Sequence, residues 1–349
     1  MIQPQSNVSL AEYSTMRLGG NAKYLLDITD AKMIGPAINW AKERNLSVIM
    51  IGTGSNIVWT DAGFDGLVLV NKILGIDVQK PDENNAYYTI GSGENWDSVV
   101  KRTVDDGYGG LAELSAVPGT TGGTPVQNVG AYGHDVSETL SSLEAYDNNL
   151  RQLVTLKASD CQFGYRSSRF NGKDKGRFYI TSVTFHVTKD APKPPFYASL
   201  AEYFEQNGIS DITTPAVRDA VMAIRRIKLP DPSVVNNNGS FFKNPIVKKE
   251  KMAQLIKDYP KIAHWENGSE FKLSAAWLIE HAGYADAHDP ATGMATWAAQ
   301  PLVLVNEHAK TTADLMAFKQ KIMDAVNQKF GVVLTQEPET IGAHPVVEK

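Results

Sequence analysis

The sequence predicts an α+β fold with more than one domain. Helical and strand patterns alternate at the start of the chain, strands dominate its middle, and helices dominate after Thr214. The chain has 349 residues, which is more than one hydrophobic core usually organises. We therefore expect two or three domains.

The first part of the chain is expected to mix helix and strand. Residues 30–45 place Ile34, Ile38 and Ala41 on one helical face, and Pro36 then belongs in the first turn. A second helix begins near residue 95 and ends at Gly107. Buried strands are expected at 47–51, 66–70 and 86–91.

The middle of the chain contains a long segment without regular periodicity. Residues 111–133 are rich in Gly, Thr, Pro and Asn, and a loop of this length inside a compact domain is usually functional. The strands expected after it are 142–147, 152–156 and 177–189. Residues 190–195 contain three prolines and are expected to form a connector.

The last part is expected to be α+β. Its helical patterns cover 215–228, 248–260, 273–283 and 311–331, the last with a threonine start and a Gly331 stop. Strands are expected at 301–306 and at 332–342. The final strand is expected to return to the first domain.

Composition argues against several classes of function. The formal net charge is −5, which disfavours nucleic acid as the main partner because phosphate binding needs a basic face. Cys161 is the single cysteine, so no intrachain disulfide can form and a reducing compartment is expected. No signal peptide is expected at the start of the chain, the apolar runs are too short for a bilayer, and no metal-site spacing occurs.

A first glycine-rich loop, "GTGSN" at residues 52–56, follows a predicted strand. Such a loop lets backbone N–H groups approach phosphate oxygens. A Rossmann fingerprint is excluded because the third glycine is missing and "IVWT" after it does not begin a helix. Alone, this loop is equally compatible with a plain turn.

A second loop, "VPGTTGGTPVQNVGAYG" at 117–133, favours a cofactor cradle. Its glycines are expected to leave many backbone N–H groups for a ligand. A floppy surface loop would rarely carry the interleaved apolar residues Val126, Val129 and Tyr132.

Six ordered motifs together resemble the UDP-N-acetylenolpyruvoylglucosamine reductase family. They are "GTGSN", "PGTTGGTPVQNVGAYG", "FGYRSSRF", "KLPDP", "GSFFKNP" and the late "EPE". The resemblance implies a vanillyl-alcohol-oxidase (PCMH) type FAD-binding fold in two subdomains, 1–73 with 331–349 and 74–213. It also implies a separate α+β substrate-binding domain at 214–330.

The resemblance implies an activity as well. NADPH would reduce non-covalent FAD, which would reduce the enolpyruvyl ether of UDP-N-acetylglucosamine enolpyruvate to UDP-N-acetylmuramate for peptidoglycan synthesis. The partners would be this UDP-sugar and NADPH, without nucleic acid or membrane insertion, in a monomeric cytoplasmic enzyme.

Three residues match the family's catalytic positions. Arg166 would grip the substrate carboxylate with two hydrogen bonds, with Arg169 as a weaker candidate. Glu337 matches the acid, whose pocket should raise its pKa, although Glu339 remains an alternative. Ser240 would protonate the carbanion that forms beside the carboxylate.

The resemblance also implies which residues bind the substrate and the cofactor. Substrate binding is assigned to Tyr197, Lys228, Asn244 and Gln300, with Tyr197 on the mobile loop of the longer-loop type of this family. FAD binding is assigned to Gly52, Thr53, Gly54, Ser55, Asn56, Pro118, Gly119, Thr120, Gly122, Gly123, Gln127, Asn128, Gly130, Ala131 and Tyr132.

The sequence departs from the family pattern at Trp265, Trp297 and the residues before Glu337, and the two tryptophans could alter nucleotide binding. Two other functions stay open. One is another FAD-dependent oxidase on the same fold, for which Cys161 offers no matching covalent flavin link. The other is a nucleotide-sugar binding protein without turnover.

Overall fold

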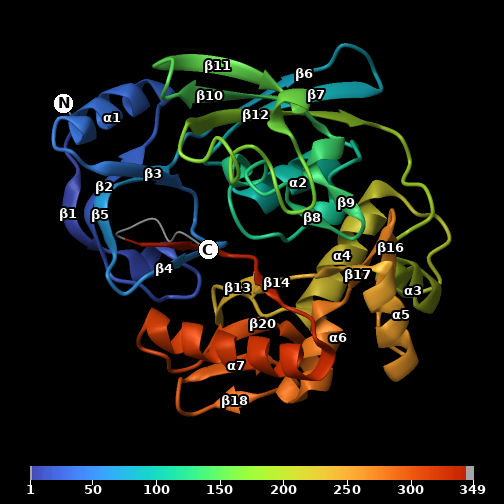
Figure 1. Ribbon diagram of the computed structural model, residues 1–349. Helices are drawn as coiled ribbons and strands as arrows, with labels where there is room; N and C mark the ends of the chain where they lie inside the picture. The colour runs from blue at the N-terminus through green and yellow to red at the C-terminus, as the bar shows by residue number, and fades with distance from the viewer. Residues whose placement is uncertain (1, 343–349) are drawn as a thin grey trace. The chain divides into compact units, whose positions relative to one another are not determined.

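The computed structural model describes residues 2–342 of the chain (Figure 1). The chain divides into two compact units. Unit 1 comprises Met1–Val8, Ala22–Thr53 and Asp65–Ile227, and unit 2 comprises Ser9–Asn21, Gly54–Phe64 and Lys228–Lys349. Each unit is therefore assembled from three separate stretches of chain.

Unit 1 begins with a four-stranded sheet in the order β1-β2-β5-β3. Its strands are β1 (Gln5–Ser9), β2 (Asn21–Ile28), β3 (Ser47–Ile51) and β5 (Phe64–Asn71). Strands β3 and β5 pair in parallel, and helix α1 (Ile34–Lys42) connects β2 to β3. Ile34, Ala37 and Ala41 of α1 are buried against Leu67 and Leu69 of β5, as the helical periodicity predicts.

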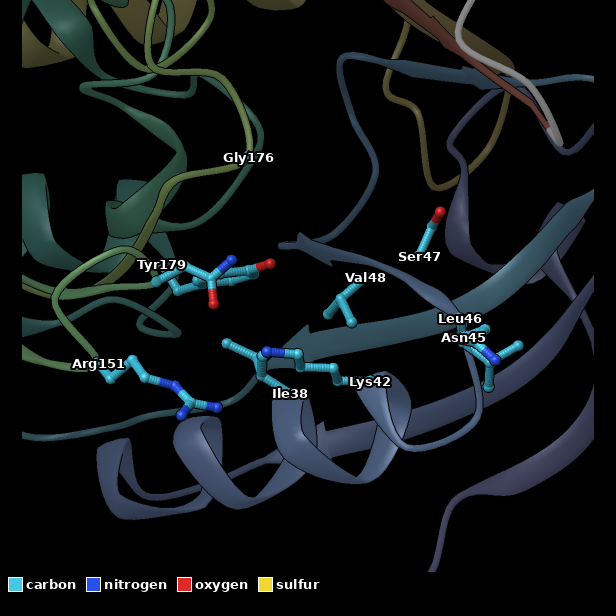
Figure 2. Close-up of a pocket in the computed structure, with 10 residues that line it drawn as sticks. Ile38, Lys42, Asn45, Leu46, Ser47, Val48, Arg151, Gly176 and Tyr179 are labelled. Atoms are coloured by element: carbon cyan, nitrogen blue, oxygen red, sulfur yellow. The ribbon is translucent and has the colours of Figure 1, made fainter.

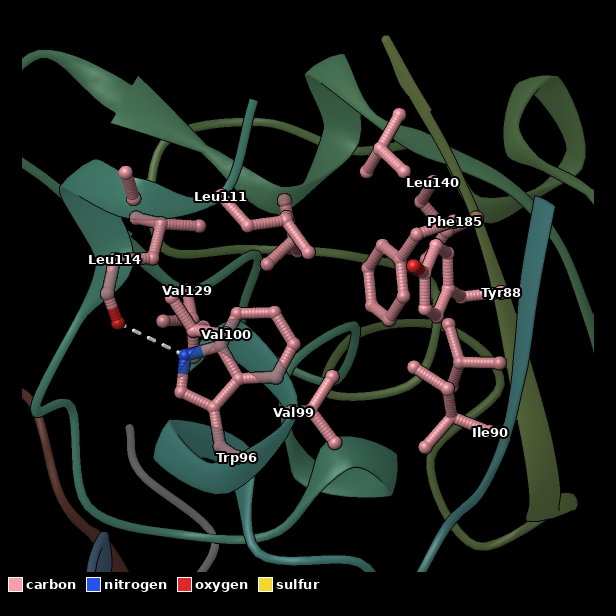
Figure 3. Close-up of a cluster of buried hydrophobic side chains, with 14 of the residues drawn as sticks. Tyr88, Ile90, Trp96, Val99, Val100, Leu111, Leu114, Val129, Leu140 and Phe185 are labelled. Atoms are coloured by element: carbon pink, nitrogen blue, oxygen red, sulfur yellow. Dashed lines mark hydrogen bonds between the residues drawn. The ribbon is translucent and has the colours of Figure 1, made fainter. Parts of the chain in front are cut away.

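A second sheet of unit 1 has the order β11-β10-β12-β7-β6. Its strands are β6 (Ile76–Gln79), β7 (Asn85–Gly91), β10 (Leu140–Asp147), β11 (Gln152–Lys157) and β12 (Phe178–Thr188). The other helices of unit 1 are α2 (Trp96–Asp105), α3 (Ala198–Gln206) and α4 (Thr214–Lys228). Trp96 is buried in the core under this sheet and its indole N–H donates to Leu114 O at 3.0 Å (Figure 3).

The long segment predicted at 111–133 contains short turns and a small hairpin rather than a continuous irregular loop. The turns are the 3₁₀ helices Ala112–Leu114 and Thr121–Gly123, and the hairpin joins β8 (Gly130–Ala131) to β9 (His134–Asp135). Further 3₁₀ turns of the chain cover Leu10–Tyr13, Ala31–Met33, Val136–Glu138 and Ala158–Cys161.

Unit 2 contains a four-stranded sheet in the order β13-β20-β19-β18 and several smaller pairings. The sheet strands are β13 (Asn236–Ser240), β18 (His288–Asp289), β19 (Met294–Trp297) and β20 (Gln300–Asn306). Strands β15 (Ile246–Lys248), β17 (Glu270–Leu273) and β16 (His264–Asn267) form a three-stranded sheet. Strand β14 (Phe242–Lys243) pairs with β21 (Thr335–Gln336), and β4 (Ile57–Trp59) pairs with β22 (Glu339–Ile341).

The helices of unit 2 are α5 (Lys249–Asp258), α6 (Ala275–Ile279), continued by a π turn at Glu280–Tyr284, and α7 (Thr312–Phe330). Thr311 and Asp314 form a capping box at the start of α7, and Gly331 ends it in the left-handed conformation, as predicted. The expected final strand at 332–342 is instead two short strands, because Pro338 has no N–H to donate to a ladder. None of the helices within residues 2–342 combines the length and apolar character needed to cross a bilayer.

Candidate active site

The two glycine-rich loops approach each other within unit 1 at Gly52 and Thr120. A Cβ added at Gly52 would be 2.5 Å from Thr120 Oγ1, so a side chain at position 52 would force the loops apart. The first loop joins strand β3 to strand β4, which confirms that it is not the strand-to-helix turn of a Rossmann fold.

The second loop is anchored more firmly than the sequence suggests. Val126, Ala131 and Tyr132 pack against the core of unit 1, as their apolar character predicts. However, the N–H of Gly122 donates to Ser92 O at 2.8 Å and that of Gly123 donates to Thr120 O at 2.9 Å. The expectation of many uncommitted N–H groups is therefore wrong for this part of the loop, where both donors already bond to backbone carbonyls of the protein.

The position beside Gly123 is exposed and open. A Cβ at Gly123 would meet Thr120 Oγ1 at 3.8 Å and no closer protein atom, whereas a Cβ at Gly122 would meet Ser92 Cβ at 2.5 Å. Adjacent glycines thus have opposite surroundings, one enclosed by protein and one open. An open glycine in an anchored loop is what close approach of a ligand requires.

Arg166 lies beside the second loop. Its Nη2 donates to Gly130 O at 2.7 Å, and a Cβ at Gly130 would be 3.0 Å from Arg166 Nη1. Glycine at 130 therefore allows the guanidinium to approach the loop. Arg166 is half-buried and has a left-handed backbone, with φ of 51°.

Arg169, the weaker candidate for the carboxylate, is committed elsewhere. Its Nε donates to Asp174 Oδ2 at 2.8 Å and its Nη1 donates to Asp160 O at 3.0 Å. These bonds close the turn that follows Arg166, so the geometry gives Arg169 a structural task.

Ser240 ends strand β13 and is followed by two buried rings. Phe241 and Phe242 are almost fully enclosed, with ring centroids 5.5 Å apart in an edge-to-face arrangement. Gly239, with φ of 67°, supplies the bend before them. The half-buried Ser240 is thus carried on a backbone that its neighbours hold firmly.

Glu337 lies next to this segment in unit 2. Its N–H donates to Phe241 O at 2.9 Å, and Phe242 pairs with Gln336 across β14 and β21. Glu339 belongs to a different pairing, opposite Ile57 of β4. The two glutamates therefore have separate surroundings, and Glu337 is the one beside the Ser240 segment.

Tyr197 forms a cluster that the sequence only partly predicts. Its ring packs edge to face on Tyr132 with centroids 5.8 Å apart. Tyr132 in turn hydrogen-bonds to Arg225 of α4, and burial raises the pKa of the Tyr132 phenol. Arg225 was missed because the family motif begins only at Lys228, although it lies one helical turn earlier.

The remaining substrate candidates are in unit 2, starting with Lys228, which is exposed at the end of α4. Asn244 accepts the Ala275 N–H at 2.9 Å through Oδ1, so this oxygen also fixes the start of α6. Gln300 pairs with Trp297 across β19 and β20. Trp265 is 39% exposed on β16, with Lys272 Nζ 5.7 Å from its ring centroid.

A separate pocket of about 520 Å³ lies in unit 1 (Figure 2). Its lining includes Lys42, Arg151 and Tyr179, and it reaches Ser47 at the start of strand β3. The first glycine loop follows the other end of β3. The pocket is therefore distinct from the surroundings of Gly52.

Comparisons with known proteins agree with this arrangement. Residues 22–153 match the model of an FAD binding domain, and residues 231–341 match that of the UDP-N-acetylenolpyruvoylglucosamine reductase C-terminal domain. The crystal structure of UDP-N-acetylenolpyruvylglucosamine reductase from Thermus caldophilus superposes with a TM-score of 0.68 at 18% identity, covering 97% of this chain and 99% of that one. The fold is therefore the predicted FAD-binding fold, and the protein is an FAD-dependent oxidoreductase.

Two homologous enzymes show which family the chain belongs to. UDP-N-acetylenolpyruvoylglucosamine reductase of Ralstonia nicotianae is 38% identical over 95% of this chain and 97% of its own length. The enzyme of the same name from Pseudomonas putida is 36% identical over 97% of this chain and 98% of its own. The chain belongs to the UDP-N-acetylenolpyruvoylglucosamine reductase family.

Proposed function

We propose that this chain reduces the enolpyruvyl ether of UDP-N-acetylglucosamine enolpyruvate to UDP-N-acetylmuramate, with NADPH as reductant, for peptidoglycan synthesis. Bound FAD would carry the hydride from NADPH to the substrate. Hydride adds to the terminal methylene carbon and a proton adds to the neighbouring carbon, so the C=C double bond becomes a single bond and two C–H bonds form. The protein must stabilise the negative charge that develops between these events.

Arg166 is assigned to the substrate carboxylate. The Arg166 guanidinium donates from Nη2 to Gly130 O at 2.7 Å. The bond also orients the planar group, which a two-pronged grip on a carboxylate requires. Arg169 is not given this role because Asp174 and Asp160 already hold it.

Ser240 is assigned as the proton donor and Glu337 as the acid beside it. The observation that carries this assignment is the hydrogen bond from Glu337 N to Phe241 O, which binds the two segments together next to Ser240. Glu337 would hydrogen-bond the developing carboxylate charge, and the serine hydroxyl would protonate the adjacent carbon.

The binding residues are assigned from the resemblance to the family. The two glycine loops bind FAD, and Lys228, Asn244, Gln300 and Tyr197 bind the UDP-sugar. Burial raises the pKa of the Cys161 thiol to about 11, so this thiol stays protonated near neutral pH, which supports non-covalent FAD. The enzyme is proposed to be monomeric and cytoplasmic.

The domain roles are part of the proposal. FAD binding is given to residues 1–73 with 331–349 and to 74–213, and substrate binding to 214–330. One spectroscopic experiment tests the reaction: NADPH should bleach the flavin absorbance, and only the UDP-sugar substrate should restore it without oxygen. Bleaching without recovery on substrate would reject the proposed reaction.

A further inference from the structure

Strand β13 contains a bulge immediately before Ser240. Asn237 pairs with Val305 and Ser240 with Val303, so one extra residue lies on β13 between these two pairs. Gly239 has φ of 67° and its N–H donates to Asn237 Oδ1 at 2.8 Å. The bulge takes Asn238 out of the regular ladder.

The Asn238 side chain is directed to the first glycine loop. Its Nδ2 lies 3.1 Å from Ser55 O and 3.3 Å from Ile57 O, the carbonyls on either side of Asn56. It also lies 3.1 Å from Thr15 Oγ1. Since backbone carbonyls only accept hydrogen bonds, the amide nitrogen must face them, and the orientation of this amide is settled by its partners.

The Asn238 side chain also has a buried oxygen that is energetically unfavourable, and a smaller residue would avoid it. Asn238 is 6% exposed, and within residues 2–342 its Oδ1 is enclosed without a hydrogen-bond partner. A buried acceptor without a partner destabilises the folded state. Such a feature is expected where a residue is kept for function rather than stability.

The proposed reaction suggests a function for the Asn238 side-chain amide. Hydride and proton must reach adjacent carbons of one substrate, so the proton donor and the flavin-binding loop need a fixed separation. An error of about 1 Å in such an alignment can cost about 10²-fold in rate. Asn238 is two residues before Ser240, and its bonds end on the loop that the proposal gives to FAD.

We propose that Asn238 is a positioning residue, whose amide holds the Ser240 hydroxyl at a set distance from the flavin-binding loop. This inference rests on the proposed function, since it requires Ser240 to be the proton donor. In the proposed mechanism Asn238 contacts no reacting atom and acts through the backbone of residues 238–240 and 55–57.

Asn238→Leu tests the role, because leucine has nearly the same shape and lacks the amide donors. In the FAD-loaded enzyme, flavin reduction by NADPH should stay within about threefold, and reoxidation by the UDP-sugar should slow about tenfold or more. The solvent deuterium isotope effect on reoxidation should rise, since proton transfer becomes slower, while the substrate KM should change little. A role in packing alone would leave this isotope effect unchanged.

The matched control is Asn236→Leu, the same change two residues earlier on β13, which should leave both half-reactions as in the wild type. Asn238→Ala gives the same comparison if the leucine variant does not fold. Reoxidation within threefold of wild type, or equal slowing of both half-reactions, would overturn the positioning role.

Ser240→Ala separates this inference from the proposed function. If Ser240→Ala reoxidises normally, Ser240 is not the donor and the proposed chemistry fails. If Ser240→Ala is impaired only in reoxidation and Asn238→Leu behaves as the wild type, the proposed chemistry stands and the positioning role alone is wrong.

Discussion

The main-chain N–H of Glu337 donates a hydrogen bond of 2.9 Å to the carbonyl oxygen of Phe241. This bond joins a segment near the C-terminus to the residue directly after Ser240. The two side chains to which we assign proton chemistry are therefore carried on one local framework, and substitutions there should affect the same half-reaction.

Ser240→Ala should separate the two half-reactions. The hydroxyl is not needed when NADPH reduces the flavin, so that step should keep nearly its normal rate. Reoxidation by substrate should slow by about 10²-fold or more, as for loss of a positioned acid. Stopped-flow absorbance of the flavin measures each step, and equal slowing of both would indicate a structural defect.

Glu337→Gln should slow reoxidation by about 10²-fold, because an amide N–H is a much weaker acid than a carboxyl O–H and stabilises the developing carboxylate charge less. Glu339→Gln is the matched control, since Glu339 lies two residues later and pairs with Ile57 of β4 instead. It should turn over at nearly the normal rate in steady-state assays. The opposite ranking of the two variants would make Glu339 the acid.

Arg166→Lys should be strongly impaired in turnover although the positive charge is kept. A lysine ammonium cannot form the planar, two-pronged contact with a carboxylate. Arg169→Lys is the comparison, and it should lower the melting temperature by loosening the Asp174 contact while kcat stays near normal. Nearly normal kcat/KM in Arg166→Lys would remove Arg166 from the carboxylate site.

Gly123→Val should lose FAD without unfolding the protein. A Cβ at 123 meets its nearest protein atom at 3.8 Å, so an added side chain occupies open space that the cofactor is proposed to need. Gly122→Val, in contrast, should destabilise the fold, because its Cβ would be 2.5 Å from Ser92 Cβ. Flavin fluorescence and thermal melting of the apoproteins measure the two effects, and full FAD occupancy in Gly123→Val would mean that the cradle is misplaced.

Asp147→Asn should destabilise unit 1 in a pH-dependent way. The buried Asp147 accepts hydrogen bonds from Arg177 at 2.7 to 3.2 Å, and these bonds lower the pKa of its carboxyl group. Because the folded-state pKa is lowered, this stabilisation is present above the unfolded value of about 3.9 and is lost as pH falls through the folded value. Urea unfolding should show a loss of about 2 kcal/mol at pH 7.

The difference between Asp147→Asn and the wild type should shrink as pH falls below about 4, where the wild-type carboxyl group also becomes protonated in the unfolded chain. A difference that stays constant from pH 7 to pH 3 would contradict an ionic contribution. Asp65→Asn is a suitable control, since Asp65 forms an exposed pair with Lys23 and should have little effect at either pH.

Local patterns predicted most of the helices but missed α3 and many of the strands, including β2. The periodicity of residues 215–228 and 311–331 predicted α4 and α7, and the Thr311 and Gly331 signals placed both ends of α7 correctly. The predicted single strand at 332–342 was wrong because its two halves pair with different strands, β14 and β4. No local pattern specifies which distant strand a short segment will join.

The site could be predicted only as far as ordered motifs reach. Arg166, Ser240 and Glu337 were identified as site candidates because they lie within such motifs. The role proposed for Asn238 depends on contacts across the chain, such as that between Asn238 and Ser55, which are 183 positions apart. The glycine loop at 117–133 is a similar case. Its pattern predicted a cradle, but it did not indicate which N–H groups bond to protein carbonyls, such as that of Gly122 to Ser92 O.

The parallel pairing of β22 with β4 has a consequence for how the protein is made. Residues 57–59 leave the ribosome long before their partners at 339–341 exist, and a contact between such distant segments forms slowly. All three segments of unit 1 precede residue 228, so this unit can collapse while unit 2 still lacks most of its chain. A nascent or prematurely terminated chain would then expose β4 as an unpaired edge, the kind of surface on which strands from other chains add.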